Sequence, residues 1–225
     1  MTFTNKNFDN LAQASYENQF MLHGATPEGV HWVGSRRQEL RFRILLEAIF
    51  EQNYTENISI ADVGCGYGAL VNYINDNIDS NKLQYFGYDI SDRLINQCKE
   101  NIHYHWANFK VGKHPHKEID HCIMSGTYNL AMTNNIQDWE DYIFNCLNAC
   151  WQKTRKSMIF NLQIAPISFI SKGNIFYGNK KRTLTKCRSY FGDTTIVQHP
   201  SLKKDAMFIA VSYTHLRAHE TRHDL

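Results

Sequence analysis

The period of hydrophobic residues along the chain changes near residue 58. Before this point apolar residues recur at helical spacing, and Phe42, Leu45 and Ile49 mark one face of a helix predicted over 35–52. A weaker helical pattern covers 5–22. From residue 58 onward, short apolar runs alternate with helical stretches, which is typical of a parallel sheet with helices on both faces. The sequence therefore predicts an α/β chain preceded by a helical segment.

Seven apolar runs are predicted as strands, at 59–64, 83–89, 107–112, 121–125, 157–163, 194–199 and 206–212. Ser91 is the expected cap of a helix after the second strand, and a further helix is predicted over 138–152. The stretch 164–181 has no clear period, so we expect an insertion over the active site there. The basic run 180–182 is predicted to be a solvated loop.

The most informative segment is the first strand and the loop that follows it. The strand ends on Asp62 and continues as Val-Gly-Cys-Gly-Tyr-Gly, which places glycines at Gly64, Gly66 and Gly68. Alternating glycines permit positive φ angles and let a ligand approach the backbone closely. The second strand ends on Asp89, where a ribose diol binds in units of this kind. A carboxylate at a buried strand end requires a cation or a hydrogen-bond donor.

Nucleotide-dependent dehydrogenases carry a similar glycine loop, which holds a pyrophosphate. An acid directly before the loop would repel that anion but suits a ligand with an ammonium group. The strand, the D-x-G-x-G-x-G loop, the helix and the strand ending in Asp together resemble the cofactor half of class I S-adenosylmethionine-dependent methyltransferases.

This resemblance implies a Rossmann-like seven-stranded methyltransferase sheet with an N-terminal helical cap, and S-adenosylmethionine as the cofactor. Asp62 would meet the cofactor's ammonium, Asp89 would bind its ribose hydroxyls and Ile90 would pack on its adenine. The full set of residues predicted to bind the cofactor in this domain is Asp62, Gly64, Cys65, Gly66, Gly68, Asp89, Ile90, Ser125 and Gly126.

The N-terminal segment, with its W-x-x-S-x-x-Q-x-x-R-F pattern from Trp32 to Phe42, is similar to a bacterial group of these methyltransferases. The likeness implies a segment that folds over the cofactor, with Arg41 as a further cofactor contact; Arg41 as a surface residue is the alternative. Trp32, Tyr128, Asn129 and Asn161 are candidate substrate residues, and both asparagines are equally typical of turns.

Two positions bear on catalysis and on adenine binding. His31 is the candidate general base, with a simply solvated loop histidine as the alternative. Many relatives carry an Asp after the third strand that binds the adenine amino group, and Lys113 stands where that acid is expected. We therefore expect adenine to be held by backbone and apolar contacts.

Composition excludes several classes of protein. The 24 basic and 22 acidic residues give a net charge of +2, which predicts neither nucleic acid nor a membrane surface as partner. The N-terminus does not resemble a signal peptide, and the six cysteines form no C-x-x-C pair, as in a cytoplasmic protein with reduced thiols. The clustered histidines lack completing carboxylates or cysteines, so no metal is predicted.

The expected organisation is a cap or lid over 1–57, a methyltransferase domain over 58–212 and a tail over 213–225. The stretch 211–221 resembles a translated sequencing adapter, so we expect the tail to be non-native; a genuine polar helix is the alternative.

The predicted function is transfer of a methyl group to O or N of a small-molecule acceptor by direct in-line displacement. The fourth strand ends in Ser-Gly-Thr-Tyr rather than the Asn-Pro-Pro-Tyr typical of amide or adenine methylation. A non-catalytic S-adenosylmethionine-binding module and an NAD(P)-dependent reductase are the alternatives. The sequence leaves the acceptor and the oligomeric state open.

Overall fold

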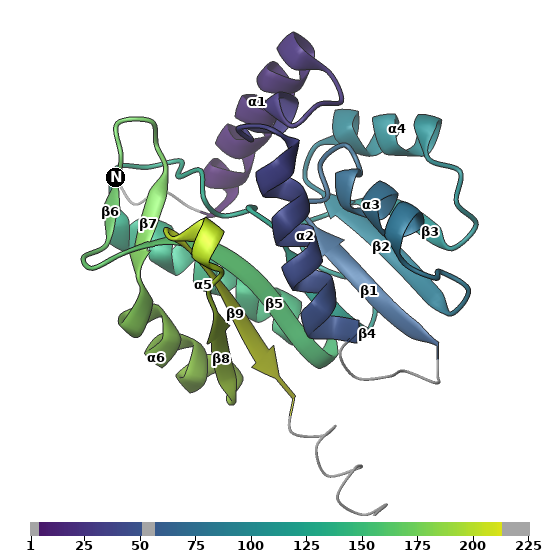
Figure 1. Cartoon of the computed structure of the whole chain (residues 1–225). Helices are drawn as coiled ribbons and strands as arrows, with labels where there is room; N and C mark the ends of the chain where they lie inside the picture. The colour runs from purple at the N-terminus through teal and green to yellow at the C-terminus, as the bar shows by residue number, and fades with distance from the viewer. Residues whose placement is uncertain (1–4, 51–56, 213–225) are drawn as a thin grey trace, which may run out of the picture.

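The computed structural model describes residues 5–50 and 57–212 (Figure 1). The N-terminal part contains helix α1 (Asn5–His23), the short 3-10 helix η1 (Glu28–Val30) and helix α2 (Ser35–Phe50). The alternating part contains β1 (Ile58–Val63), α3 (Ala69–Asn77), β2 (Leu83–Asp89), α4 (Asp92–Asn101), β3 (Ala107–Val111), β4 (Ile119–Met124), α5 (Ile136–Trp151) and β5 (Thr154–Ala165). The rest contains β6 (Phe169–Ile170), β7 (Phe176–Asn179), α6 (Lys180–Phe191), β8 (Thr194–Val197), the 3-10 helix η2 (Pro200–Leu202) and β9 (Asp205–Val211).

The predicted 213–225 tail and the expected end of the second helix at 51–52 lie outside the described residues. Within the described ranges, no helix is long and apolar enough to cross a membrane.

The strands form one sheet, in which β3, β2, β1, β4 and β5 lie side by side and parallel. Strand β9 pairs antiparallel with β5, and β8 pairs antiparallel with β9. The short strand β7 extends the sheet beside the last residues of β5, with β6 at its edge. All seven predicted strands are present, with ends that differ by a few residues, and the α/β prediction is confirmed.

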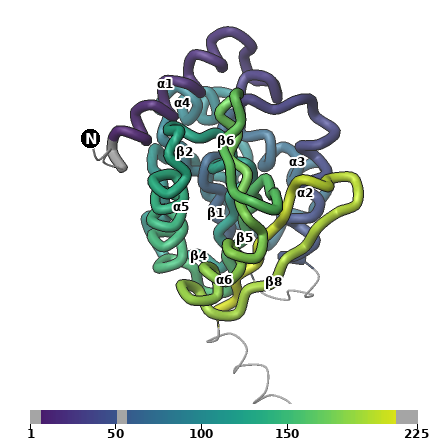
Figure 2. Tube along the Cα trace, turned by 90° about the vertical axis from the view of Figure 1, so that its left-hand side faces the viewer, coloured from purple at the N-terminus to yellow at the C-terminus, as the bar shows by residue number. Residues whose placement is uncertain are grey.

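Helices cover both faces of the sheet because its central strands are buried on both sides. Alternate residues of β1 point to opposite faces, so Ile58 and Ile60 pack with α2, α3 and α4, whereas Ala61 and Val63 pack with α5 and α6. Figure 2 shows α5 on one side of β1 and α2 with α3 on the other. The predicted helices on both faces are confirmed.

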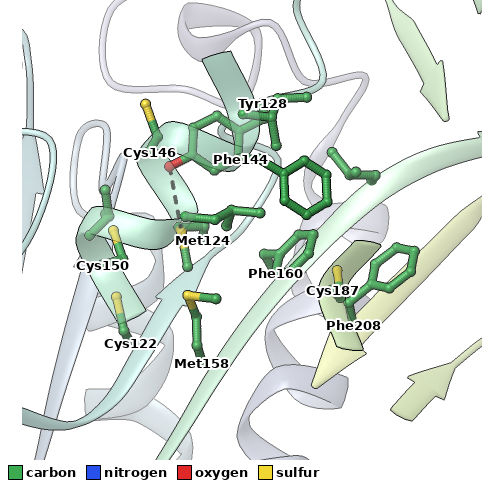
Figure 3. Close-up of a cluster of buried hydrophobic side chains, with 14 of the residues drawn as sticks. Cys122, Met124, Tyr128, Phe144, Cys146, Cys150, Met158, Phe160, Cys187 and Phe208 are labelled. Atoms are coloured by element: carbon green, nitrogen blue, oxygen red, sulfur yellow. Dashed lines mark hydrogen bonds between the residues drawn. The ribbon is translucent and has the colours of Figure 1, made fainter. Parts of the chain in front are cut away.

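The core beneath α5 and α6 is rich in sulfur (Figure 3). Cys122, Cys146, Cys150 and Cys187 lie there among methionine and phenylalanine side chains, and the rings of Phe160 and Phe208 stack with centroids 5.2 Å apart. All six cysteines of the chain are free and buried. Burial raises the pKa of Cys146 and of Cys187 to about 12, so both remain thiols that act as packing residues.

The stretch 164–181, where an insertion over the active site was predicted, contains regular structure that its sequence pattern did not indicate. It contains the end of β5, the β6–β7 hairpin and the start of α6. Strands of two and four residues are too short to show an alternating pattern, although Phe176 is buried. The basic run 180–182 forms the first turn of α6 rather than a loop, because Asn179 accepts a hydrogen bond from the Arg182 N–H (2.8 Å) and caps the helix.

Helix α1 lies across the carboxyl edge of the parallel strands (Figure 1). Its Phe8 ring packs edge-on against Trp139 (centroids 5.7 Å apart) and Tyr142 (5.5 Å) of α5. Further along, Glu17 accepts a hydrogen bond from the Ser91 hydroxyl at the start of α4 (2.8 Å). The N-terminal helix is therefore attached to elements on both sides of this edge.

Replacing Phe8 tests how α1 is held. In Phe8→Ala we expect faster amide hydrogen exchange across α1 with little change in β1 and β4, because deleting a buried Phe side chain costs about 3–5 kcal/mol of packing. Leu11→Ala, at a half-exposed position of the same helix, is the matched control. Equal exchange rates in the two variants would show that α1 does not depend on this aromatic contact.

Candidate functional site

The glycine loop joins β1 to α3 at the carboxyl edge of the sheet. Gly64, Gly66 and Gly68 have φ angles of 79°, 57° and 85°, in the left-handed region that favours glycine. A side-chain carbon at Gly64 would lie 2.7 Å from the Thr127 side chain. The N–H groups of Gly64 and Cys65 both donate to the Tyr88 carbonyl (2.7 and 3.0 Å). The loop is thus fixed against the end of β2.

Two buried carboxylates stand at the ends of β1 and β2. Asp62 is 3% exposed, and its Oδ2 accepts a hydrogen bond from the Tyr85 hydroxyl (2.6 Å). Asp89 is 8% exposed and accepts from the N–H groups of Gly66 (3.0 Å) and Ser91 (2.9 Å). Within the described residues, neither carboxylate forms a salt bridge.

Burial dominates the electrostatics of this pair. It raises the pKa of Asp62 to about 7, and the nearby charge of Asp89 adds to the effect, while the Tyr85 hydrogen bond opposes it. Burial also raises the pKa of Asp89 to about 6, against the three backbone N–H groups that lower it. A carboxylate has about four acceptor positions, so both groups keep some for a ligand.

These residues line an inner cavity between the strand ends and the N-terminal segment. Eight of the nine residues predicted to bind the cofactor in the methyltransferase domain lie on its wall, namely Asp62, Gly64, Cys65, Gly66, Asp89, Ile90, Ser125 and Gly126. The Ser125 hydroxyl is buried there without a hydrogen-bond partner in the described part of the chain. Gly68 is outside the lining; a side-chain carbon there would collide with Ile102, so it serves the packing of α3.

The N-terminal segment also supplies wall residues; Trp32 and Gln38 were candidate contacts from the sequence, whereas Ala12, Tyr16 and Phe42 were not. Ala12 and Tyr16 come from α1, and Gln38 and Phe42 come from α2. Burial raises the pKa of Tyr16, so its hydroxyl stays neutral. The weak pattern of α1 predicts a helix but contains no signal for its position over the sheet edge, which is why Ala12 and Tyr16 were missed.

An outer cavity adjoins the inner one. Tyr16, Val30, Trp32, Gly126 and Leu130 line both. The further lining of the outer cavity is His31, Val33, Arg37, Arg41, Asn129, Gln163, Ile175 and Tyr177. Among the predicted substrate residues, Trp32 therefore lies between the two cavities, Tyr128 lines the inner one and Asn129 lines the outer one.

Arg41 is buried rather than a surface residue, and it lines the outer cavity, not the inner one. Its Nε donates to Asp205 Oδ2 (2.7 Å), and its guanidinium carbon lies 4.4 Å from the centre of the Trp32 ring. Asp205 also accepts hydrogen bonds from the Asn161 amide (3.1 Å) and the Gln163 amide (2.8 Å). Asp205 and its three partners form a single polar network.

Asn161 extends this network to the wall of the inner cavity. Its Oδ1 accepts a hydrogen bond from the Gly126 N–H (2.6 Å), although Asn161 itself lines neither cavity. A side-chain carbon at Gly126 would lie 2.7 Å from Trp32, so glycine is required for this close approach. Asn129 is likewise tied to the backbone, since its Oδ1 accepts from the Gln163 N–H (3.0 Å).

The ring of His31 lies at the rim of the outer cavity. The residue adopts a left-handed φ of 63°, and its Nε2 is 3.2 Å from the Ser15 hydroxyl. Partial burial lowers the pKa of His31, with a smaller contribution from the charge of His23, so the imidazole is neutral at pH 7. Across residues 5–50 and 57–212, no three His, Cys, Asp or Glu side chains are arranged to hold a metal ion.

Lys113 does lie in the inner cavity wall, at the position where an acid was expected. Its Nζ pairs with Asp9 Oδ2 of α1 (2.7 Å), and Asp9 Oδ1 accepts from the Tyr142 hydroxyl (2.8 Å). The carboxylate of Asp9, on the N-terminal helix α1, therefore lies beside the position where the acid was expected, and Lys113 binds it there.

Comparison with known proteins supports the same fold. No protein-family profile matches the chain. A curated Mycobacterium tuberculosis protein named "Putative methyltransferase Rv1506c" is 24% identical over 150 residues, which cover 65% of this chain and 89% of that protein.

Two solved structures share the architecture at low sequence identity. Magnesium protoporphyrin IX methyltransferase (ChlM) from Synechocystis PCC 6803 with bound SAM has a TM-score of 0.61 and 10% identity, over 93% of this chain and 97% of that one. The CurJ carbon methyltransferase has a TM-score of 0.58 and 10% identity; the match covers 89% of this chain but only 65% of that chain. The chain therefore has the Rossmann-like fold of class I methyltransferases, as predicted.

The raised pKa of Asp62 makes stability depend on pH. The folded state binds a proton more tightly than the unfolded state, so the free energy of unfolding falls as the pH rises from about 4 to about 7. The loss reaches about 1.4 kcal/mol per pH unit, and Asp62→Asn, which stays neutral, removes this contribution. Urea unfolding at pH 5 and pH 8 measures it, with exposed Asp76→Asn as control. The expectation fails if the Asp62 and Asp76 variants have the same pH profile.

A second prediction about stability concerns the buried ion pair between Arg41 and Asp205. Asp205→Asn leaves the buried guanidinium without its counter-charge, which costs about 3–5 kcal/mol in urea unfolding. Exposed Asp193→Asn, directly before β8, is the control. If both variants lose the same small amount, the pair does not hold the N-terminal segment in place.

Proposed function

We propose that this protein is an S-adenosylmethionine-dependent methyltransferase that transfers a methyl group to O or N of a small-molecule acceptor by in-line displacement. The observation that carries the proposal is a pair of buried carboxylates at the glycine loop, Asp62 and Asp89, which have no salt-bridge partner among residues 5–50 and 57–212. The curated relative named as a methyltransferase and the solved structure with bound SAM support it.

The inner cavity fits this cofactor by the chemistry of its donors and acceptors. Asp62 offers a carboxylate to the ammonium group, and the Tyr85 hydroxyl fixes its orientation. Asp89 offers its remaining acceptor positions to the ribose hydroxyls, and the Gly66 N–H holds the carboxylate toward the loop. When bound, the cofactor supplies an electrophilic sulfonium methyl: the sulfur–carbon bond breaks as the acceptor–carbon bond forms, and sulfur keeps the bonding electron pair.

The adenine end would lie against Ile90, with the Lys113–Asp9 ion pair beside it. This pair takes the place of the acid that relatives carry on the loop after the third strand. It also joins α1 to that loop, so the helix covers the adenine end of the cavity. Residues 1–57 are accordingly proposed as the cap, and 58–212 as the methyltransferase domain.

The methyl-transfer end would lie where the two cavities meet. Ser125 and Gly126 lie on the inner wall there, and the unpartnered Ser125 hydroxyl is available to the cofactor or the acceptor. Trp32 and Tyr128 position the acceptor by contact, whereas Asn129 and Asn161 shape the wall through their hydrogen bonds to the backbone. Orienting two reactants in this way supplies much of the rate of a displacement at carbon.

His31 is the proposed general base for a hydroxyl or a protonated amine acceptor. A neutral imidazole at the rim of the outer cavity can take up the proton that such an acceptor loses and release it to solvent. The six free cysteines support a reducing, cytoplasmic location.

Calorimetric titration with S-adenosylhomocysteine tests the proposal. We expect saturable binding to the wild type and its loss in Asp89→Ala, because the ribose hydroxyls lose their acceptor. Ligand at about 100 times its dissociation constant also stabilises the fold by about 2.7 kcal/mol. Asp76→Ala, on the exposed side of α3, is the control and should bind normally.

The alternatives give different results in the same assay. A non-catalytic module would bind S-adenosylhomocysteine but turn over no methyl donor with any acceptor. An NAD(P)-dependent reductase would bind NADH or NADPH and not S-adenosylhomocysteine, and that outcome would refute the proposed function.

A further inference from the structure

A third cavity adjoins the outer cavity beside the β6–β7 hairpin. Tyr177 of β7 lines both, and Gln163 of the outer cavity is followed directly by Ile164 of the third. Gln163 and Tyr177 are paired residues of β5 and β7. We call this third space the lysine cavity, because Lys180, Lys181, Lys203 and Lys204 line it. Figure 1 shows that the hairpin and α1 both lie toward the top of the view, where the parallel strands have their carboxyl ends.

Charge is distributed unevenly over these two spaces. Two arginines and four lysines line the outer and lysine cavities, and no aspartate or glutamate does. The charge of Asp205 is close to both Arg41 and Arg37, but in the described ranges no salt bridge involves any of the four lysines. The chain as a whole is nearly neutral, with 24 basic and 22 acidic residues. The uncompensated positive charge is therefore a property of this region.

Four lysines without an acidic partner in the described part of the chain repel one another, and an anion bound among them relieves that repulsion. Lysine side chains bind phosphate as mobile point charges. The aromatic wall between the cavities is preformed, since the rings of Phe169 and Tyr177 stack with centroids 4.6 Å apart and planes at 4°. Such a wall accommodates an apolar or planar portion of a ligand that spans the two spaces.

We infer that the acceptor is an elongated small molecule with a phosphate ester group. Its methyl-accepting atom lies where the inner and outer cavities meet, beside Gly126 and Trp32, and its phosphate lies in the lysine cavity with Tyr177 between them. This inference rests on the proposed function, because the direction of the acceptor is set by where the methyl donor binds.

The test uses full-length protein saturated with S-adenosylhomocysteine, so that the inner cavity is filled. Phenyl phosphate is titrated by calorimetry and by NMR shift changes, with phenol as the probe that lacks the anion. We expect saturable binding of phenyl phosphate that is at least tenfold tighter than that of phenol. Lys203→Gln with Lys204→Gln should weaken it about tenfold.

The matched control is Lys99→Gln with Lys110→Gln, which removes two exposed lysines from α4 and β3 at the other end of the sheet. This variant should bind phenyl phosphate like the wild type. All three proteins should bind S-adenosylhomocysteine equally, which shows that the substitutions leave the fold and the inner cavity intact.

Three results would overturn the inference. These are no binding of phenyl phosphate, equal binding by both double variants, or phenol binding as tight as that of phenyl phosphate. Tighter lysine-dependent binding of a ten-residue oligothymidylate would replace it with a single-stranded nucleic acid surface. If S-adenosylhomocysteine binds and phenyl phosphate does not, only this inference fails; if S-adenosylhomocysteine does not bind, the proposed function fails first.

Discussion

The buried ion pair between Arg41 and Asp205 is the contact on which the arrangement of the cavities depends. It joins residues 164 positions apart, one on α2 and one at the start of β9. A guanidinium this deeply buried is stable only with a fully hydrogen-bonded counter-charge, so α2 cannot shift without breaking the network. Through Asn161 the same network fixes the Gly126 backbone, and through Arg41 it supports the Trp32 ring. One polar cluster thus sets the boundary between the inner and outer cavities.

Unlike the Arg41–Asp205 pair, the buried acids of the inner cavity have no salt-bridge partner among the described residues. Asp62 and Asp89 are buried close together with neutral donors as partners, which makes their ionised forms costly in the free protein. A ligand that brings a positive charge recovers part of that cost on binding. Burial of the two carboxylates therefore lowers the stability of the free protein but strengthens the binding of a cation. A cationic ligand is favoured over a neutral ligand of the same shape.

The parts of the fold predicted from sequence are those with local signals. The glycine loop and its flanking acids identify the carboxyl edge of the sheet, since glycine at positive φ and a buried acid are both properties of the nearby chain. The placement of α1 over this edge has no such local signal. Tyr16 on the wall and Asp9 beside Lys113 depend on how α1 packs, and its contacts with α5 come from Phe8 and Asp9, which stand in a weak helical pattern. Asn161 resembles a turn former in sequence, yet it acts inside a network whose central residue, Asp205, lies far along the chain.

The two sides of the junction at Gly126 carry charges of opposite sign. In the described part of the chain, Asp62 and Asp89 have no salt-bridge partner at the inner cavity, where Lys113 is paired with Asp9, and the four lysines have none at the lysine cavity. A cationic methyl donor and an anionic acceptor would each be favoured on one side and disfavoured on the other, so the field itself orients both reactants. In the proposed reaction the donor would lose its sulfonium charge as the methyl leaves, and only its ammonium group would remain to bind Asp62. The proposed reaction would therefore weaken binding of the demethylated donor, whereas the proposed phosphate contact of the acceptor would be unchanged.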